Sequence, residues 1–177
     1  FEIAAGMRKG SFDGTYYNDS DVFKIIEGAA YSLRVTPDPE LEGYLDTLIA
    51  KIAAAQEDDG YLFTIRTINP DHEQIRGEER WENLRDKHEL YNVGHMYEAA
   101  IAYYRATGKD KLLRVAKKSA DHIQRVIFEG VPEYNDGKPV MQAPGHQEIE
   151  LALVKLFRVT GERKYLDMAR RFLEIRG

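Results

Sequence analysis

The sequence predicts an all-α fold in which α-hairpin repeats form half of an (α/α)6 toroid. Apolar residues recur at helical spacing in six stretches of the chain. Segments that begin at Thr36, Thr107 and Thr160 share a helix-breaking start, a charged turn and matching apolar offsets. Their spacing gives a unit of about 50–70 residues, longer than the roughly 34 residues of a tetratricopeptide repeat, which favours a closed ring over an open solenoid.

The first hairpin is predicted from a cap, a break and two apolar stripes. Asp19-Ser20-Asp21 places capping side chains directly before the first stripe, a role we prefer to cation binding. Residues 36–39 break this helix, and Leu41 to Ala55 form its antiparallel partner. Residues 61–64 are β-prone, and residues 69–80 read as a polar loop.

A second hairpin follows. Its first helix is predicted to start from a cap at Asp86, run to about Ala106 and stop at Gly108. Residues 112–127 give the next helix one buried face, with His122 expected on its surface or edge.

The third hairpin is predicted after a loop over residues 129–143. Pro144 opens its first helix, and Thr160-Gly161 ends it. Residues 165–173 carry the apolar pattern of the last helix.

Length and composition predict a single domain over residues 1–177. The net charge of -5 argues against a nucleic-acid partner. Since no apolar run approaches 18 residues, we expect no membrane span. A soluble protein of the bacterial cytoplasm or periplasm is favoured over a membrane protein, and the sequence leaves the compartment open. The absence of cysteine excludes a thiolate metal site or a cysteine nucleophile within these residues.

Most of the candidate chemistry lies between Trp81 and Ala100. On a helix that starts at Asp86, one stripe carries His88, Tyr91, Asn92, His95 and Glu98. His88 and His95 stand about 10 Å apart along such a helix and cannot chelate one metal together. The pairs Gly94-His95 and Gly145-His146 occur at corresponding repeat positions, which in a toroid converge on one axis.

Aromatic and acidic residues in these segments suit a sugar, though core packing and capping explain them as well. Tyr61, Trp81 and Tyr91 could stack on the apolar face of a sugar ring. Glycoside hydrolysis needs two carboxylates, but the acids do not single out a pair, so no catalytic residue is assigned; they are Glu89, Glu98, Glu148 and Glu150.

Four stretches together resemble glycoside hydrolase family 127, the β-L-arabinofuranosidase-like proteins. They are DSDVFKIIEGAAYSL, LIAKIAAAQEDDGYL, RWENLRDKHELYNVGHMYEAAIAYYRATG and PGHQEIELALVKLFRVTGERKYLDMARRFLEIRG. The resemblance implies an (α/α)6 barrel followed by β-sandwich domains, acting on arabinofuranosides of plant glycans or glycoproteins with retention of configuration. It implies that His95 and His146 contact the sugar and that His88 and Glu89 belong to an HELY motif. Tyr91, Trp81 and Gln147 complete the expected substrate-binding set.

Members of that family use a cysteine nucleophile held on zinc by further cysteines and a glutamate, with a separate glutamate as acid/base. All of these lie downstream of the matched region, so the resemblance implies that this chain supplies substrate contacts only and is inactive alone. Zinc is then expected only in a longer parent, and the rest of the barrel or a homo-oligomer covers the open edge. Two alternatives remain open: a non-catalytic helical-repeat binding module, and another α/α-toroid carbohydrate enzyme such as an epimerase or lyase.

Overall fold

The computed structural model describes residues 1–177 and is all-helical, as predicted. Its elements are α1 (Asn18–Val35), α2 (Pro39–Ala55), α3 (Thr64–Ile68), α4 (Glu89–Thr107), α5 (Lys111–Ile123), a π-helical turn (Gln124–Glu129), a 3-10 turn (Asn135–Gly137), α6 (Glu148–Thr160) and α7 (Arg163–Arg176). No helix is both long and apolar enough to cross a bilayer.

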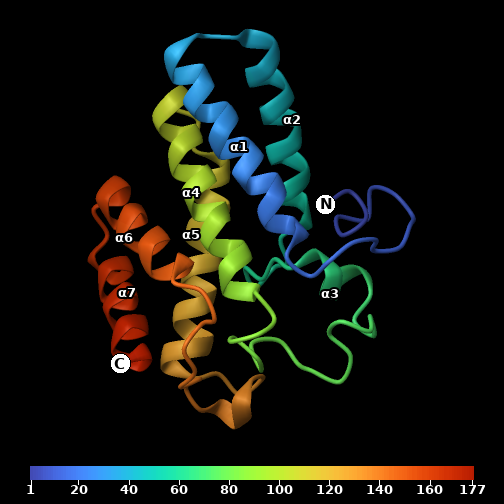
Figure 1. Ribbon diagram of the computed structural model, residues 1–177, viewed down its shortest axis with the longest axis vertical. Coiled ribbons are helices and arrows are strands. Elements are labelled where there is room, and N and C mark those ends of the chain that lie inside the picture. Colours follow the sequence, from blue (N-terminus) through green and yellow to red (C-terminus); the bar gives the residue numbers. More distant parts are fainter.

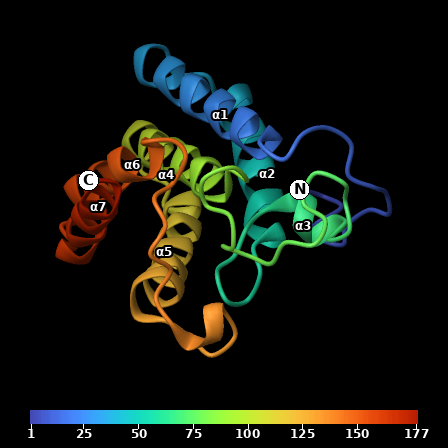
Figure 2. The same cartoon turned by 60° about the horizontal axis from the view of Figure 1, so that its bottom comes forward.

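Three α-hairpins stack side by side in this fold. The hairpins are α1–α2, α4–α5 and α6–α7, and α4 packs against α1 on one side and α6 on the other (Figures 1 and 2). The first helices of the three hairpins run in the same general direction in Figure 1, so their N-terminal ends lie on the same side of the stack, near the middle of the molecule's height. This arrangement is consistent with the predicted half toroid.

Three helix ends have the standard caps, and two of these, Gly108 and Gly161, are the predicted stop residues. Asp38 accepts hydrogen bonds from the N–H groups of Glu40 and Leu41, with Pro39 at the first helical position. Helices α4 and α6 end at Gly108 and Gly161, whose φ angles are 74° and 73°.

Asp19 does not cap α1, contrary to expectation. Helix α1 starts at Asn18 without a side-chain cap, and Asp19 is buried inside its first turn. Its carboxylate accepts from the Thr64 N–H at 2.9 Å and the Thr64 hydroxyl at 2.6 Å. Asp19 therefore fastens the start of α3 to α1.

The β-prone residues 61–64 do not form a strand. Tyr61, Leu62 and Phe63 are buried, and Thr64 begins α3. These side chains pack into the helical core, where no neighbouring strand is present to pair with them.

His122 lies in the core and not at the surface or edge. Its side chain is 2% exposed, and Nε2 accepts a hydrogen bond from the indole of Trp81 at 3.1 Å. The prediction was wrong because the loop that contains Trp81 covers a side of α5 that the helical pattern alone leaves polar.

Candidate functional site

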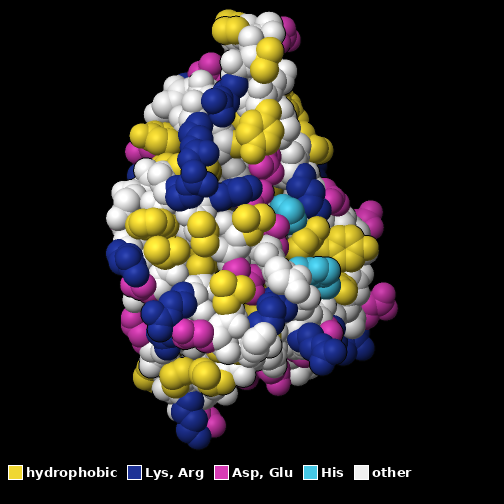
Figure 3. Space-filling view, turned by 60° about the vertical axis from the view of Figure 1, so that its left-hand side comes forward, with side chains coloured by type: hydrophobic (Ala, Val, Ile, Leu, Met, Phe, Trp, Pro, Cys, Tyr) yellow, Lys and Arg dark blue, Asp and Glu magenta, His cyan; other side chains and the backbone are white.

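Four predicted residues meet at the N-terminal ends of α4 and α6. We call His88, Tyr91, His95 and His146 the histidine cluster. The Tyr91 ring contacts all three imidazoles, with ring centroids 5.4, 4.5 and 4.9 Å from those of His88, His95 and His146. His146 is exposed and the other three are half-buried. Histidine side chains are visible on the face shown in Figure 3.

Helix α4 begins two residues later than expected, with its N-cap at His88 and not at Asp86. His88 occupies the N-cap position with φ 62°, in the left-handed region that non-glycine residues rarely adopt. A helix from Asp86 would have placed His88 on the same stripe as His95; instead its ring turns towards the segment before α6.

The imidazoles of His88 and His146 share a hydrogen bond. His88 Nε2 lies 2.9 Å from His146 Nε2, and His88 Nδ1 lies 2.9 Å from the Asp86 carbonyl oxygen. A carbonyl oxygen only accepts, so Nδ1 carries the proton of neutral His88, and Nε2 is an acceptor. His146 Nε2 therefore donates. Burial, and to a smaller degree His146, lower the pKa of His88, which favours this neutral form.

His95 faces Glu148 of α6, with Nδ1 3.4 Å from Oε1. Burial, followed by the Lys24 charge, lowers the pKa of His95 to about 4. Burial, followed by the Glu98 charge, raises the pKa of Glu148 to about 7. Near neutral pH the imidazole is therefore uncharged, and this contact is not an ion pair between two full charges.

Lys24 of α1 joins the cluster without a clear sequence signal. Its ammonium donates to the Tyr91 hydroxyl at 2.8 Å and to Ser20 Oγ at 3.0 Å. Lys24 lies 67 positions from Tyr91, and local periodicity carries no information about such a long-range pair.

Glu148 is one of the four acids among which the sequence assigns no catalytic residue, and its contact with His95 is a further pair that local pattern does not predict.

Trp81 and Glu89 lie in the core, each 2% exposed. Glu89 accepts from the Trp81 N–H at 3.1 Å and from the Tyr61 hydroxyl at 2.5 Å. This burial does not support the expected stacking of Trp81 on a sugar or a direct contact from Glu89. Gln147 lies exposed at the N-cap position of α6.

The two Gly-His pairs are not structurally equivalent, although both histidines contact Tyr91. Gly94 lies in the second turn of α4, whereas Gly145 precedes α6. A Cβ on Gly94 would come within 2.6 Å of Glu148 Cγ, and one on Gly145 within 1.9 Å of the Arg85 carbonyl oxygen. Both glycines are thus explained by close packing.

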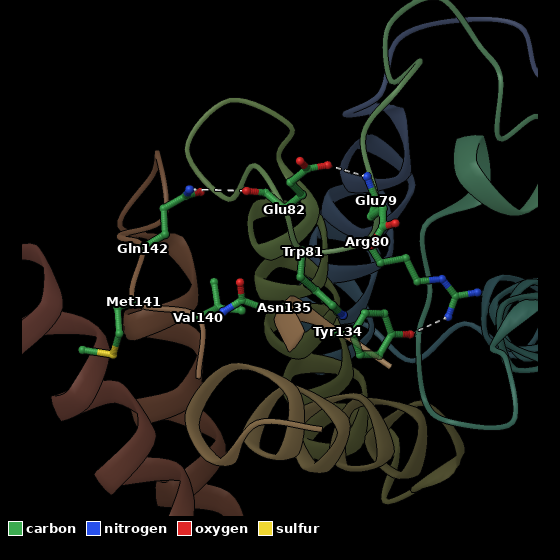
Figure 4. A pocket seen from close by; sticks show the side chains of 9 residues that line it. All are labelled: Glu79, Arg80, Trp81, Glu82, Tyr134, Asn135, Val140, Met141 and Gln142. Atoms are coloured by element: carbon green, nitrogen blue, oxygen red, sulfur yellow. Dashed lines mark hydrogen bonds between the residues drawn. The ribbon is translucent and has the colours of Figure 1, made fainter. Parts of the chain in front are cut away.

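A separate hollow of about 320 Å³ lies between two loops (Figure 4). Trp81 and Tyr134 line it together with Arg80, whose guanidinium hydrogen-bonds the Tyr134 hydroxyl and pairs with Glu57 and Asp59. Its lining includes none of the cluster residues. We place the candidate site at the cluster, where the predicted side chains converge on Tyr91, and not at this hollow.

The residues of this chain do not fit the cysteine-held zinc ion that the resemblance implies. No cysteine is present, and no three side chains of His, Asp or Glu converge in a metal-ligating arrangement. We therefore assign no step to a metal bound by this chain.

A family model and a curated relative both match this chain to the same protein family. Residues 2–177 match the family described as β-L-arabinofuranosidase, GH127 catalytic domain. A non-reducing end β-L-arabinofuranosidase of Bifidobacterium longum subsp. longum is 42% identical over 176 residues, which cover 99% of this chain and 26% of that protein. The chain thus spans about a quarter of the length of this relative.

Solved structures agree with this match. A GH127 β-L-arabinofuranosidase from Geobacillus stearothermophilus T6 superposes with a TM-score of 0.87 at 45% identity, over 98% of this chain and 26% of that one. A second GH127 β-arabinofuranosidase gives a TM-score of 0.84 at 45% identity, over 97% and 27%. The family match over residues 2–177 therefore shows that this chain belongs to the GH127 β-L-arabinofuranosidase catalytic-domain family.

Proposed function

We propose that the histidine cluster contacts the sugar in the substrate pocket of a glycoside hydrolase acting on arabinofuranosides. The observation that carries this proposal is the convergence of three imidazoles on the Tyr91 ring at one accessible end of the helices. The names of the similar proteins, β-L-arabinofuranosidases, support the substrate class.

The chemistry of the cluster suits an uncharged ligand rich in hydroxyl groups. His88 uses both ring nitrogens within the chain, on Asp86 and His146. His95 and His146 are then the imidazoles left to meet sugar hydroxyls, and Lys24 adds further donors beside the Tyr91 hydroxyl. The Tyr91 ring supplies an apolar face for the C–H groups of a sugar. Gln147, at the exposed start of α6, extends the polar set.

We further propose a division of labour within a longer protein. Residues 1–177 form one part-barrel domain that binds substrate, and the nucleophile, the acid/base and any zinc ligands lie outside them. The remaining hairpins of the barrel cover the open sides of α1 and α6. The partial coverage of the relatives supports this view.

A chimera tests the proposal. This chain replaces the corresponding quarter of the Geobacillus enzyme, and hydrolysis of an aryl β-L-arabinofuranoside is measured. We expect activity, with His95→Ala and His146→Ala each lowering kcat/KM about tenfold or more because a sugar hydroxyl loses its partner.

His72→Ala is the matched control, since His72 lies in the loop after α3, where its ring packs on Phe12 and on no residue of the cluster. A chimera whose activity is the same with and without His95 and His146 would overturn the proposed contacts. A well-folded chimera that cleaves other glycosides but no arabinofuranoside would overturn the proposed substrate.

A further inference from the structure

A single buried carboxylate joins both ends of the loop that presents His88. The loop runs from Trp81 to His88, and both of these residues adopt left-handed backbone angles, φ 63° and 62°. Glu89, directly after the loop, accepts the Trp81 N–H through both carboxylate oxygens, at 3.3 and 3.1 Å. The end of the loop is therefore bonded back to its beginning.

The same carboxylate is anchored to a third segment. The Tyr61 hydroxyl donates to Glu89 Oε1 at 2.5 Å, and the guanidinium of Arg80 lies over the Tyr61 ring at 4.2 Å. The Trp81 indole is held in turn by His122. Left-handed conformations at non-glycine residues persist only where the surroundings determine them, and these contacts meet that requirement.

Glu89 directly follows His88, so the position of Glu89 affects the conformation of His88 in the histidine cluster. With Glu89 fixed, the left-handed His88 directs Nδ1 to the Asp86 carbonyl and Nε2 to His146. We infer that Glu89 is a positioning residue, which holds His88 in the Nδ1-protonated tautomer, so that its Nε2 accepts from His146 and keeps that imidazole in place in the sugar-binding cluster. The role in sugar binding rests on the proposed function; the control of the His88 tautomer does not.

Glu89→Gln tests the inference without changing side-chain size. An amide offers one oxygen and one NH2, so with the oxygen on Tyr61 the NH2 faces the Trp81 N–H, donor against donor. Long-range ¹H–¹⁵N NMR of the labelled 177-residue chain reports the tautomer of each histidine. We expect a single His88 tautomer in the wild type, and in the variant a mixture with a His88 pKa closer to its ordinary value.

Asp19→Asn is the matched control. Asp19 is another buried carboxylate, which ties the start of α3 to α1 through Thr64 and makes no hydrogen bond to the loop before α4. It should lower stability and leave the His88 tautomer unchanged. A folded Glu89→Gln chain with the wild-type His88 tautomer and pKa would overturn the inference.

Tyr61→Phe decides the matter if Glu89→Gln does not fold. It removes one donor to the carboxylate and keeps the ring under Arg80. A mixture of His88 tautomers then supports the inference, and an unchanged single tautomer overturns it. Because no sugar is needed, loss of arabinofuranoside hydrolysis in the chimera and loss of His88 positioning are separate outcomes.

Discussion

Glu148 packs directly against Gly94, so closely that a Cβ on residue 94 would lie 2.6 Å from Glu148 Cγ. This contact brings α6 against α4 at the level of His95, whose Nδ1 faces the Glu148 carboxyl. Only a glycine at position 94 leaves room for α6 to approach α4 this closely, and so to place Glu148 beside His95.

Gly94→Ala should therefore destabilise the chain, although alanine is the better helix former. Overpacking at a tight helix contact costs about 1–3 kcal/mol, more than the gain of roughly 0.5–1 kcal/mol in helix propensity. Urea denaturation gives the free energy of unfolding. Gly28→Ala is the control: it lies in α1 with no heavy atom within 4 Å of its Cβ position, and it should be stabilising. Equal effects at the two sites would contradict the packing argument.

Gly145→Ala should displace His146 from His88. The added Cβ would meet the Arg85 carbonyl oxygen, a backbone atom that cannot rotate away. We expect loss of the hydrogen bond between the two imidazoles, seen as a change in the ¹⁵N shifts of both rings. Gly43→Ala, in open space on α2, should leave these shifts unchanged; a similar change in both variants would argue against a specific clash.

Glu148→Gln should alter how stability depends on pH. Burial and the Glu98 charge raise the pKa of Glu148 from 4.5 to about 7. The folded chain therefore holds this proton more tightly than the unfolded chain, so ionisation lowers the free energy of unfolding as the pH rises from 4.5 to 7. The variant lacks this loss.

The difference in free energy of unfolding between Glu148→Gln and the wild type should shift by about 1–3 kcal/mol in favour of the variant between pH 4.5 and about pH 8. Urea denaturation at the two pH values measures the difference. Glu73→Gln, in an exposed loop position, should show nearly the same difference from wild type at both pH values. A pH-independent difference for Glu148→Gln would show that its carboxyl is not perturbed in the folded chain.

His122→Leu should destabilise the core. The Trp81 indole N–H would lose its acceptor while buried, at a cost of about 1–3 kcal/mol. Trp81 is the sole tryptophan, so its fluorescence follows unfolding directly. His72→Leu, in the loop after α3, should change the free energy of unfolding by about 0.5 kcal/mol or less, and an equally small effect at His122 would refute the role of its hydrogen bond.

Much of the fold follows from local pattern. Apolar periodicity and the stop signals at Thr36, Gly108 and Gly161 predict the hairpins, because a helix that buries one stripe must repeat it every three or four residues. The all-α class and the stacking of repeats are confirmed. Helix starts are predicted less well, since Asp19 and Asp86 carry capping side chains but neither occupies an N-cap position.

The candidate site could be predicted only in part. The tautomer of His88 depends on a left-handed angle that no glycine or asparagine signals, and on Glu89, whose partners are 8 and 28 positions away. His122 was misplaced for the same reason, because its partner Trp81 lies 41 positions earlier. Local patterns determine helices, but contacts of this kind arise only once loops cover the bundle.

The loop from Trp81 to His88 is fixed along its length as well as at its ends. Both ends are held by Glu89, while Glu82 within it is exposed. Between the ends, the Glu82 carbonyl accepts from the Gln142 amide, the Leu84 carbonyl accepts from the Gly145 N–H, and the Leu84 side chain is buried. A residue inserted into this loop would therefore disturb the segment that carries His146, so the two segments must change length or shape together.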